Sequence, residues 1–250
     1  MVSLQSLDRR KYPLLWMLLK MRSVMVATPC YGGNLSSVFV HSFFRAIEPL
    51  KAAGYWLDLQ TRSAESLIPR ARNAMLAHFI GRQEFSDLLW IDADIGFEPE
   101  LLIELLDDGG PMAAAAVPLK GQPLQFSFNR HDADDLPRET YIDPGQRWLE
   151  VSAAGGLVLM RRAAVEELVE AYAHLSYEND IPGYNDPASL GNFYDLFSPM
   201  IHPVSRRYLS EDYALCYRWA AIHGHLDLLI AHRVQHAGQV VFAGVMSANT

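Results

Sequence analysis

The sequence predicts an α/β protein in which a mainly parallel, Rossmann-like central sheet is flanked by helices on both faces. Short apolar runs that suit buried strands alternate with helical patterns along the first half of the chain. This alternation is typical of parallel sheets, because a parallel connection needs a crossover element. The length of 250 residues and the hydrophobic fraction of 50% suit a single domain with a large core.

The first half of the chain contains the clearest strand and helix patterns. We expect strands at residues 24–28, 55–60, 87–91 and 112–117, and helices at residues 37–53, 69–80 and 99–106. Gly54 and Gly81 fit the ends of two helices, and Pro69 lies in the first turn of the second.

The second half is less regular. We expect strands at residues 125–128, 148–151, 157–160 and 226–230, and helices at residues 163–171 and 210–223. Residues 176–207 carry many aromatic side chains but no sustained period. A connection of this length is usually functional or disordered, and its aromatic content favours an ordered lid or acceptor wall. The alternative is a packed surface excursion that binds no ligand.

Composition limits the class of protein. The formal net charge of −8 gives no support to broad binding of nucleic acid. No apolar run approaches the roughly 20 residues that span a bilayer. The cysteines, Cys30 and Cys216, form neither a metal-ligand spacing nor a disulfide framework. We therefore expect a soluble, cytoplasmic protein without a transmembrane segment.

Two carboxylates follow one of the predicted buried strands. Asp92 and Asp94, separated by Ala93, come directly after residues 87–91. Residues i and i+2 of an extended chain point the same way, so both side chains can face one cation. Carboxylate oxygens suit Mg²⁺ or Mn²⁺. In the alternative interpretation Asp94 caps the next helix and Asp92 is merely solvated.

A second segment is expected at the same edge of the sheet. Thr28 and Pro29 end the first strand, and the carboxyl ends of parallel strands share one ligand-binding edge. The following loop, Tyr31-Gly32-Gly33, has no glycine fingerprint of the dinucleotide-binding or P-loop kind. The sequence thus disfavours a simple dehydrogenase or kinase.

The order of these motifs resembles that of the nucleotide-sugar glycosyltransferases of the GT-A fold, similar to family-2 enzymes of bacterial and phage type. The matching segments are 24–29, Ile68-Pro69-Arg70-Ala71-Arg72-Asn73, Asp92-Ala93-Asp94, Gly155-Gly156, Ser210-Glu211-Asp212-Tyr213 and His236-Ala237-Gly238. The resemblance implies a single domain over residues 24–250 after an N-terminal extension at 1–23. It also implies a nucleotide-sugar-binding half at 24–120 and a smaller, mixed acceptor-side half at 121–250.

The resemblance further implies a Mn²⁺ or Mg²⁺ ion and a nucleoside-diphosphate sugar, with a UDP-sugar as the expected donor. Asp94 and His236 would be direct metal ligands, while Asp92 would contact the ribose or a metal-bound water. The residues expected to bind the donor are Thr28, Pro29, Tyr31, Arg70, Arg72, Asn73, Asp92, Ala93, Lys120, Gly155 and Gly156. For the arginines and Lys120, the alternative role is a surface salt bridge.

By resemblance to inverting enzymes, Asp212 is the expected general base, and Glu211 would hold the acceptor. Retaining enzymes of the same fold also place acids here, so the stereochemistry stays open. Alternatively, Ser210 caps a helix whose dipole favours both acids in its first turn. The acceptor stays open between a glycan, a lipid carrier, a protein and a modified DNA base, although the net charge gives no support to nucleic acid. The alternative functions are a sugar-nucleotide nucleotidyltransferase and a non-catalytic protein that binds sugar nucleotides or carbohydrate.

Overall fold

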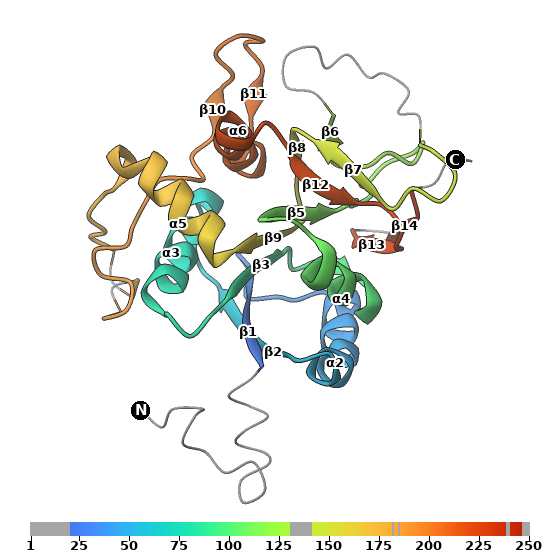
Figure 1. Cartoon of the computed structure of the whole chain (residues 1–250). Coiled ribbons are helices and arrows are strands. Elements are labelled where there is room, and N and C mark those ends of the chain that lie inside the picture. The colour runs from blue at the N-terminus through green and yellow to red at the C-terminus, as the bar shows by residue number, and fades with distance from the viewer. Residues whose placement is uncertain (1–20, 131–141, 182, 185, 239–240, 247–250) are drawn as a thin grey trace, which may run out of the picture.

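The fold is built on one seven-stranded sheet with the strand order β2-β1-β3-β9-β5-β12-β7 (Figure 1). The computed structural model describes residues 21–130, 142–181, 183–184, 186–238 and 241–246. Most of the expected N-terminal extension, residues 1–20, lies outside the described residues. The same holds for residues 131–141, which lie between the strands expected at 125–128 and 148–151.

Five of the seven strands run in the same direction. The strands are β1 (Arg22–Pro29), β2 (Tyr55–Arg62), β3 (Asp87–Ile91), β5 (Met112–Ala115), β7 (Trp148–Val151), β9 (Leu157–Arg161) and β12 (Leu226–Leu229). β1 is parallel to β2 and β3, and β12 is parallel to β5. β9 and β7 run the other way. The expectation of a mainly parallel sheet is confirmed.

Strand β9 departs from simple strand-helix alternation. It lies between β3 and β5 and is antiparallel to both, so it separates the two parallel parts of the sheet. Its chain enters beside the end of β3, where the Asp92 amide donates to the Gly156 carbonyl at 2.9 Å. Gly156 has a φ of +87°, a conformation that glycine adopts without strain. An antiparallel neighbour needs no crossover helix, so alternation in the sequence could not predict it.

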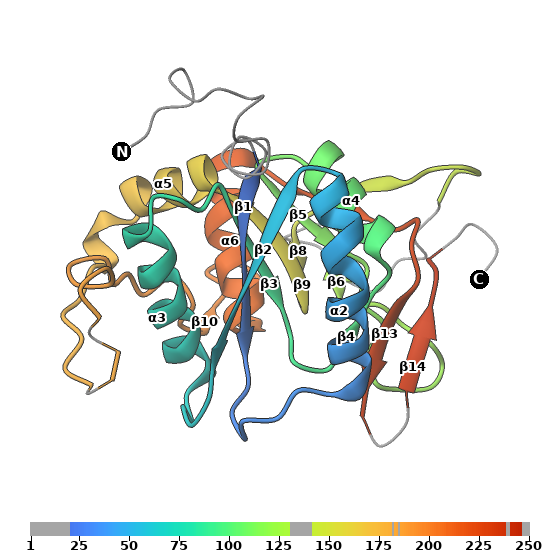
Figure 2. The ribbon, with the colours of Figure 1, turned by 90° about the horizontal axis from the view of Figure 1, so that it is seen from below.

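Helices cover both faces of the sheet, as expected (Figure 2). α2 (Ser37–Ala52) and α4 (Pro99–Asp108) pack on one face. α3 (Ile68–Gly81), α5 (Arg162–Ala171) and α6 (Glu211–His223) pack on the other. Alternate residues of β1 contribute to the two cores, because successive side chains of a strand point to opposite faces.

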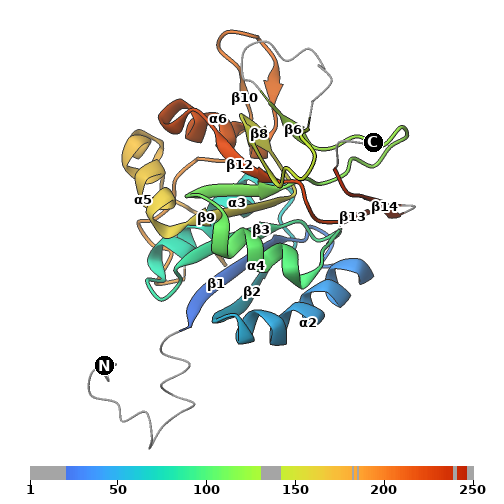
Figure 3. The ribbon, with the colours of Figure 1, turned by 45° about the vertical axis from the view of Figure 1, so that its right-hand side comes forward.

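Three small sheets accompany the central sheet in the described part of the chain. They are β14-β13-β4, with β4 (Ile95–Gly96), β13 (Val234–Ala237) and β14 (Val241–Gly244), the β6-β8 pair (Phe128–Asn129 and Ala153–Ala154), and the β10-β11 hairpin (Met200–Ile201 and Tyr208–Leu209). Figure 3 shows β13 and β14 beyond the central sheet. Their two- to four-residue lengths are too short to give a recognisable period, so the sequence analysis missed most of them.

The aromatic segment expected at residues 176–207 is ordered in its described part. Tyr184 and Phe193 pack with Ala74 and Ala77 of α3 in a small apolar cluster. A short 3₁₀ helix, η2 (Ala173–Leu175), precedes it. Among the described helices, none combines the length and apolarity needed to cross a bilayer.

A buried carboxylate at the start of β3 gives a test of the fold. The side chain of Asp87 is 0% exposed, and its Oδ1 accepts from Arg22 at 2.7 Å and from Arg161 at 2.9 Å. We expect Asp87→Ala to lower the free energy of unfolding by about 3–5 kcal/mol, because it leaves two cations without their counter-ion. Urea denaturation measures this. The control, Glu48→Ala, removes an acid whose side chain is 82% exposed and should change stability by less than about 0.5 kcal/mol. Equal effects would contradict the assigned role of Asp87.

Candidate functional site

The candidate site lies where β1 and β3 end side by side. Ala27 pairs with Trp90 in parallel register, so Pro29 and Asp92 follow at the same edge of the sheet. The Ala93 carbonyl accepts from the Ser36 amide at 2.9 Å, which ties the acidic loop to the start of α2. The expected convergence of the two segments is therefore present.

A short strand pairing brings Asp94 and His236 together. β4 follows Asp94 directly and is antiparallel to β13, with Ile95 opposite His236. The Ala237 amide donates to the Asp94 carbonyl at 2.8 Å. His236 Nε2 then lies 3.4 Å from Asp94 Oδ1, although 142 positions separate the two residues in the sequence.

The ring of His236 is oriented by the backbone. Its Nδ1 lies 2.8 Å from the Pro118 carbonyl oxygen, which can only accept, so Nδ1 carries a proton. Nε2 is then the ring atom that faces the Asp94 carboxylate. A carbonyl that fixes the ring through its other nitrogen is the usual support of a metal-binding histidine. Asp94 and His236 therefore fit a shared cation.

Lys120 provides a positive charge at the same position. Its Nζ pairs with Asp94 Oδ2, on the other oxygen from the one that faces His236. Burial works against the ionised form of Asp94, but hydrogen bonds from His236 and Lys120 outweigh it and lower the pKa of the carboxyl. Within the described ranges, no group of three or more His, Cys, Asp or Glu side chains is placed to hold a metal ion by itself. Further ligands would have to come from substrate and water.

A buried arginine organises the carboxylates next to this pair. Arg72 is 2% exposed, and its Nη2 lies 2.8 Å from Asp92 Oδ1 and 3.1 Å from Asp212 Oδ1. Its Nε lies 3.7 Å from Glu211 Oε1. Burial disfavours the guanidinium charge, yet the three carboxylates together raise the pKa of Arg72. We call these four residues the arginine cluster.

The acids of the arginine cluster outnumber its cation. Burial, with the charges of Asp212 and Asp94, raises the pKa of Asp92 to about 6 against the opposing effect of Arg72. Burial also raises the pKa of Asp212, opposed by Arg72 and by a hydrogen bond from the Gly156 amide. With Asp94 and Lys120 included, four carboxylates face two side-chain cations. An additional cation would therefore be stabilised here.

Gly155 allows the first turn of α6 to approach. A Cβ atom at this position would lie 2.7 Å from Asp212 Oδ2 and 3.2 Å from Asp212 Cβ. Any larger residue would therefore displace the Asp212 side chain. The Gly155-Gly156 pair thus has a direct geometric role at the arginine cluster.

Of the two residues that were alternatively expected to cap a helix, Asp94 does not occupy an N-cap position and Ser210 does. α4 begins at Pro99 with Glu98 as its N-cap, so Asp94 does not cap a helix. Ser210 occupies the N-cap position of α6, but its side chain makes no capping hydrogen bond. Glu211 and Asp212 are in the first turn of α6, where the helix dipole favours acids, and they also contact Arg72.

The remaining expected donor ligands occupy different places. Thr28 is fully buried beneath the edge, and its hydroxyl has no hydrogen-bond partner among the described residues. Tyr31 is exposed on the loop after β1, and its carbonyl accepts from Ala64. Arg70 donates twice to Glu65, at 2.7 Å from Nε and from Nη2. Arg70 therefore makes the ion pair that was its alternative role, and it does so away from the acidic edge.

Asn73 faces the aromatic segment. Its amide nitrogen donates to Asp195 at 2.8 Å, and its oxygen accepts from the Phe197 amide at 3.2 Å. It therefore joins α3 to residues 195–197.

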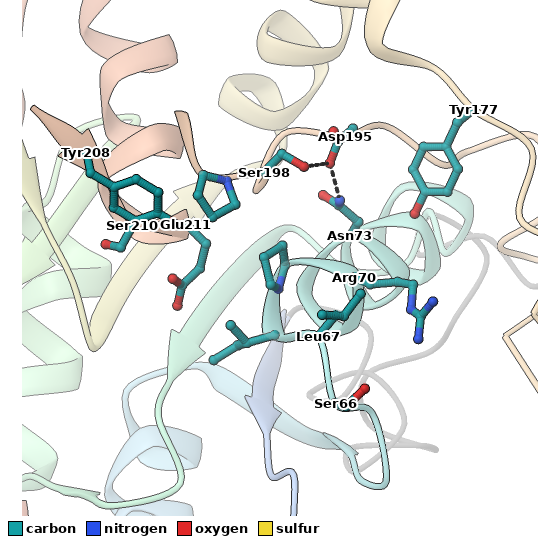
Figure 4. Close-up of a pocket in the computed structure, with 13 residues that line it drawn as sticks. Ser66, Leu67, Arg70, Asn73, Tyr177, Asp195, Ser198, Tyr208, Ser210 and Glu211 are labelled. Atoms are coloured by element: carbon teal, nitrogen blue, oxygen red, sulfur yellow. Dashed lines mark hydrogen bonds between the residues drawn. The ribbon is translucent and has the colours of Figure 1, made fainter. Parts of the chain in front are cut away.

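A cavity of about 810 Å³ opens here between the start of α3 and the start of α6 (Figure 4). We call it the side pocket; it is lined by Ser66, Leu67, Ile68, Pro69, Arg70, Asn73, Tyr177, Asp195, Ser198, Pro199, Tyr208, Ser210 and Glu211.

Several residues of the site escaped the sequence analysis. The Pro118 carbonyl is a backbone group with no side-chain signal, and Glu65 precedes α3 without belonging to a recognised motif. Tyr177 lies in the segment that was expected to form an acceptor wall. For Tyr177, aromatic content was the available signal, but it could not indicate which ring faces the cavity.

Comparisons with known proteins give structural likenesses alone. No protein family and no curated protein matches the chain. The chain is similar to A197 from STIV, with 16% identity and a TM-score of 0.49 over 87% of this chain and 86% of that one. It is also similar to a 4-diphosphocytidyl-2C-methyl-D-erythritol synthase from Anaerococcus prevotii DSM 20548, with 10% identity and a TM-score of 0.37 over 64% and 80% of the two chains.

A third solved structure with a similar backbone is a glycosyltransferase involved in the glycosylation of the major capsid of PBCV-1. Its identity is 10% and its TM-score 0.28, over 67% of this chain and 71% of that chain. Likenesses at these identities and scores carry no information about activity.

The Glu65–Arg70 pair predicts an acid-sensitive contribution to stability. Hydrogen bonds from Arg70 lower the pKa of Glu65 from 4.5 to about 2, so the ionised carboxylate stabilises the folded state. Because the folded-state pKa is the lower one, this stabilisation is full above about pH 4.5 and is lost as the pH falls toward about 2. We expect the stability difference between wild type and Glu65→Gln to shrink over this window in urea titrations.

The matched control is Glu150→Gln, at an exposed acid on β7. Its difference from wild type should stay small and nearly constant over the same pH range. A wild-type advantage over Glu65→Gln that persists undiminished at pH 2 would contradict the assigned ion pair.

Proposed function

We propose that this protein is a metal-dependent glycosyltransferase of the GT-A type, which moves a sugar from a nucleoside-diphosphate sugar to an acceptor hydroxyl. The observation that carries the proposal is the juxtaposition of the Asp94–His236 pair with the arginine cluster at the carboxyl edge of β1 and β3. Ligands of mainly parallel α/β sheets bind at this edge.

Asp94 and His236 are the residues that would hold a Mn²⁺ or Mg²⁺ ion. The Asp94 carboxylate is the kind of ligand that both ions prefer, and the His236 imidazole would add a nitrogen ligand beside it. Bound there with diphosphate oxygens and water, the ion would neutralise the charge that develops on the leaving diphosphate. Lys120 pairs with the same carboxylate and would contribute a second positive charge to the phosphates.

Asp92 and Arg72 would keep the donor side of the site in a fixed arrangement. Arg72 is buried and cannot reach a ligand without losing its carboxylate contacts, so its role is to position the acids. Asp92 retains one carboxylate oxygen outside the hydrogen bond with Arg72. That oxygen would accept a hydrogen bond from the donor ribose or from a water on the metal.

Asp212 is the proposed general base. It lies in the first turn of α6, and its sequence neighbour Glu211 lines the side pocket. Because burial raises the pKa of Asp212, the ionised carboxylate is a stronger base than an ordinary aspartate. It would accept the proton of an acceptor hydroxyl that attacks the anomeric carbon, and this role corresponds to an inverting transfer.

The metal site is tested by donor binding. We expect Asp94→Asn and His236→Ala each to weaken the Mn²⁺-dependent affinity for UDP by at least roughly tenfold, because each removes a ligand. Calorimetric titration with and without Mn²⁺ measures this. The control is His232→Ala, whose ring contacts Glu104 away from the acidic edge and which should bind as wild type does. Unchanged Mn²⁺-dependent affinity in both site variants would refute the metal assignment.

The base is tested by turnover. We expect Asp212→Asn to lower Mn²⁺-dependent hydrolysis of the UDP-sugar cleaved by wild type by roughly 100- to 10,000-fold, since an amide cannot accept the proton. UDP affinity should be retained. The control is Asp180→Asn, at an exposed residue of the long connection. Near-wild-type turnover of Asp212→Asn would refute the general-base role, and Asp212 would then be only an acid in the first turn of a helix.

A further inference from the structure

The side pocket has a lining whose chemistry selects among the acceptors that the sequence leaves open. We infer that it binds an uncharged saccharide beside Glu211, in the first turn of α6 that also carries Asp212. This inference rests on the proposed function and adds the class of acceptor to it. The cavity volume of about 810 Å³ is within the roughly 300–1,000 Å³ typical of small-molecule sites.

The walls of the side pocket suit the carbon-bound hydrogens of a sugar ring. Tyr177 and Tyr208 contribute aromatic rings from two different segments, and Figure 4 shows them on opposite sides of the cavity. Leu67, Pro69 and Pro199 add flat or aliphatic surface to the lining. The negative face of an aromatic ring attracts weakly positive C–H groups, and a pyranose presents several of these on one side.

The polar groups of the side pocket suit hydroxyl donors. The carboxylate of Glu211 lies 3.7 Å from Arg72 Nε, and no hydrogen bond to it is found among the described residues. It extends into the cavity in Figure 4. Asp195 accepts from both Asn73 and Ser198 through Oδ1, so Oδ2 remains available. Two carboxylates that need donors are matched by a ligand with several hydroxyls.

The charges of the side pocket oppose an anionic acceptor. Asp195 and Glu211 are both acidic, and the cation in the described lining is Arg70. The charge of Arg70 is already neutralised by the two hydrogen bonds it donates to Glu65. A phosphorylated or carboxylated ligand would therefore meet two carboxylates without an available counter-ion. This disfavours nucleic acid and phosphate-linked lipid head groups within the side pocket.

The test measures saccharide binding by the full chain without donor or metal. The probes are neutral methyl glycosides and disaccharides of the common hexoses, each compared with its 6-phosphate or uronate counterpart by saturation-transfer NMR and calorimetry. We expect at least one neutral saccharide to bind and its anionic counterpart to bind at least tenfold more weakly. Binding of no neutral saccharide, or equal or tighter binding of the anions, overturns the inference.

Two variants locate the binding site. Tyr208→Ala removes a ring that is 69% exposed at the pocket, so its effect on folding should be small, and we expect at least a tenfold loss of saccharide affinity. The matched control is Phe44→Ala, which removes a 68% exposed ring on α2 and should bind as wild type does. Glu211→Gln should narrow the preference for the neutral saccharide over its anionic counterpart. An unchanged affinity in Tyr208→Ala overturns the assigned location.

A separate measurement distinguishes failure of the inference from failure of the proposed function. Mn²⁺-dependent hydrolysis of UDP- and GDP-sugars by wild type requires no acceptor and tests the function alone. Donor hydrolysis without saccharide binding supports the proposed glycosyltransferase function and overturns the inference that the acceptor is a neutral saccharide. Saccharide binding that is lost in Tyr208→Ala supports the pocket assignment whether or not a donor is hydrolysed. If no donor is hydrolysed, the proposed glycosyltransferase function is refuted and the saccharide site is retained.

Discussion

The structure of the candidate site depends on the burial of one guanidinium group. Arg72 comes from α3, yet it contacts Asp92 after β3 and two acids in the first turn of α6. Three acids gathered out of water would repel one another, and ionisation of each would be costly without a central cation. Arg72 therefore allows segments from both halves of the chain to meet. Gly155 serves the same arrangement by leaving room for Asp212.

The hydrophobic pattern of the sequence correctly predicted the longer strands and helices. The bounds of β3 and β7 agree with the expected 87–91 and 148–151, because five and four apolar-rich residues between turn signals define a strand locally. The antiparallel direction of β9 and the pairing of β4 with β13 depend on partners far away in the sequence. No local pattern encodes such partners, so these features required the structure.

The expected site residues illustrate the same limit. Motif order indicated Asp94 and His236 together, and the structure places them 3.4 Å apart. Motif order also grouped Arg70 with Arg72, but the two are two positions apart on a helix and so point in different directions. Arg72 enters the core, whereas Arg70 binds Glu65 at the side pocket. Residue type alone could not separate these roles, because helical phase relative to the rest of the fold decides them.

The first turns of α3 therefore contribute side chains to both the acidic edge of the sheet and the side pocket. Arg72 faces the acidic edge, while Arg70 and Asn73 face the side pocket, and each residue of a helix is rotated by about 100° from the one before it. A single-residue insertion or deletion in this stretch would turn all three side chains at once. The register of α3 thus couples the acidic edge to the side pocket, because a change of register would move the side chains of both together.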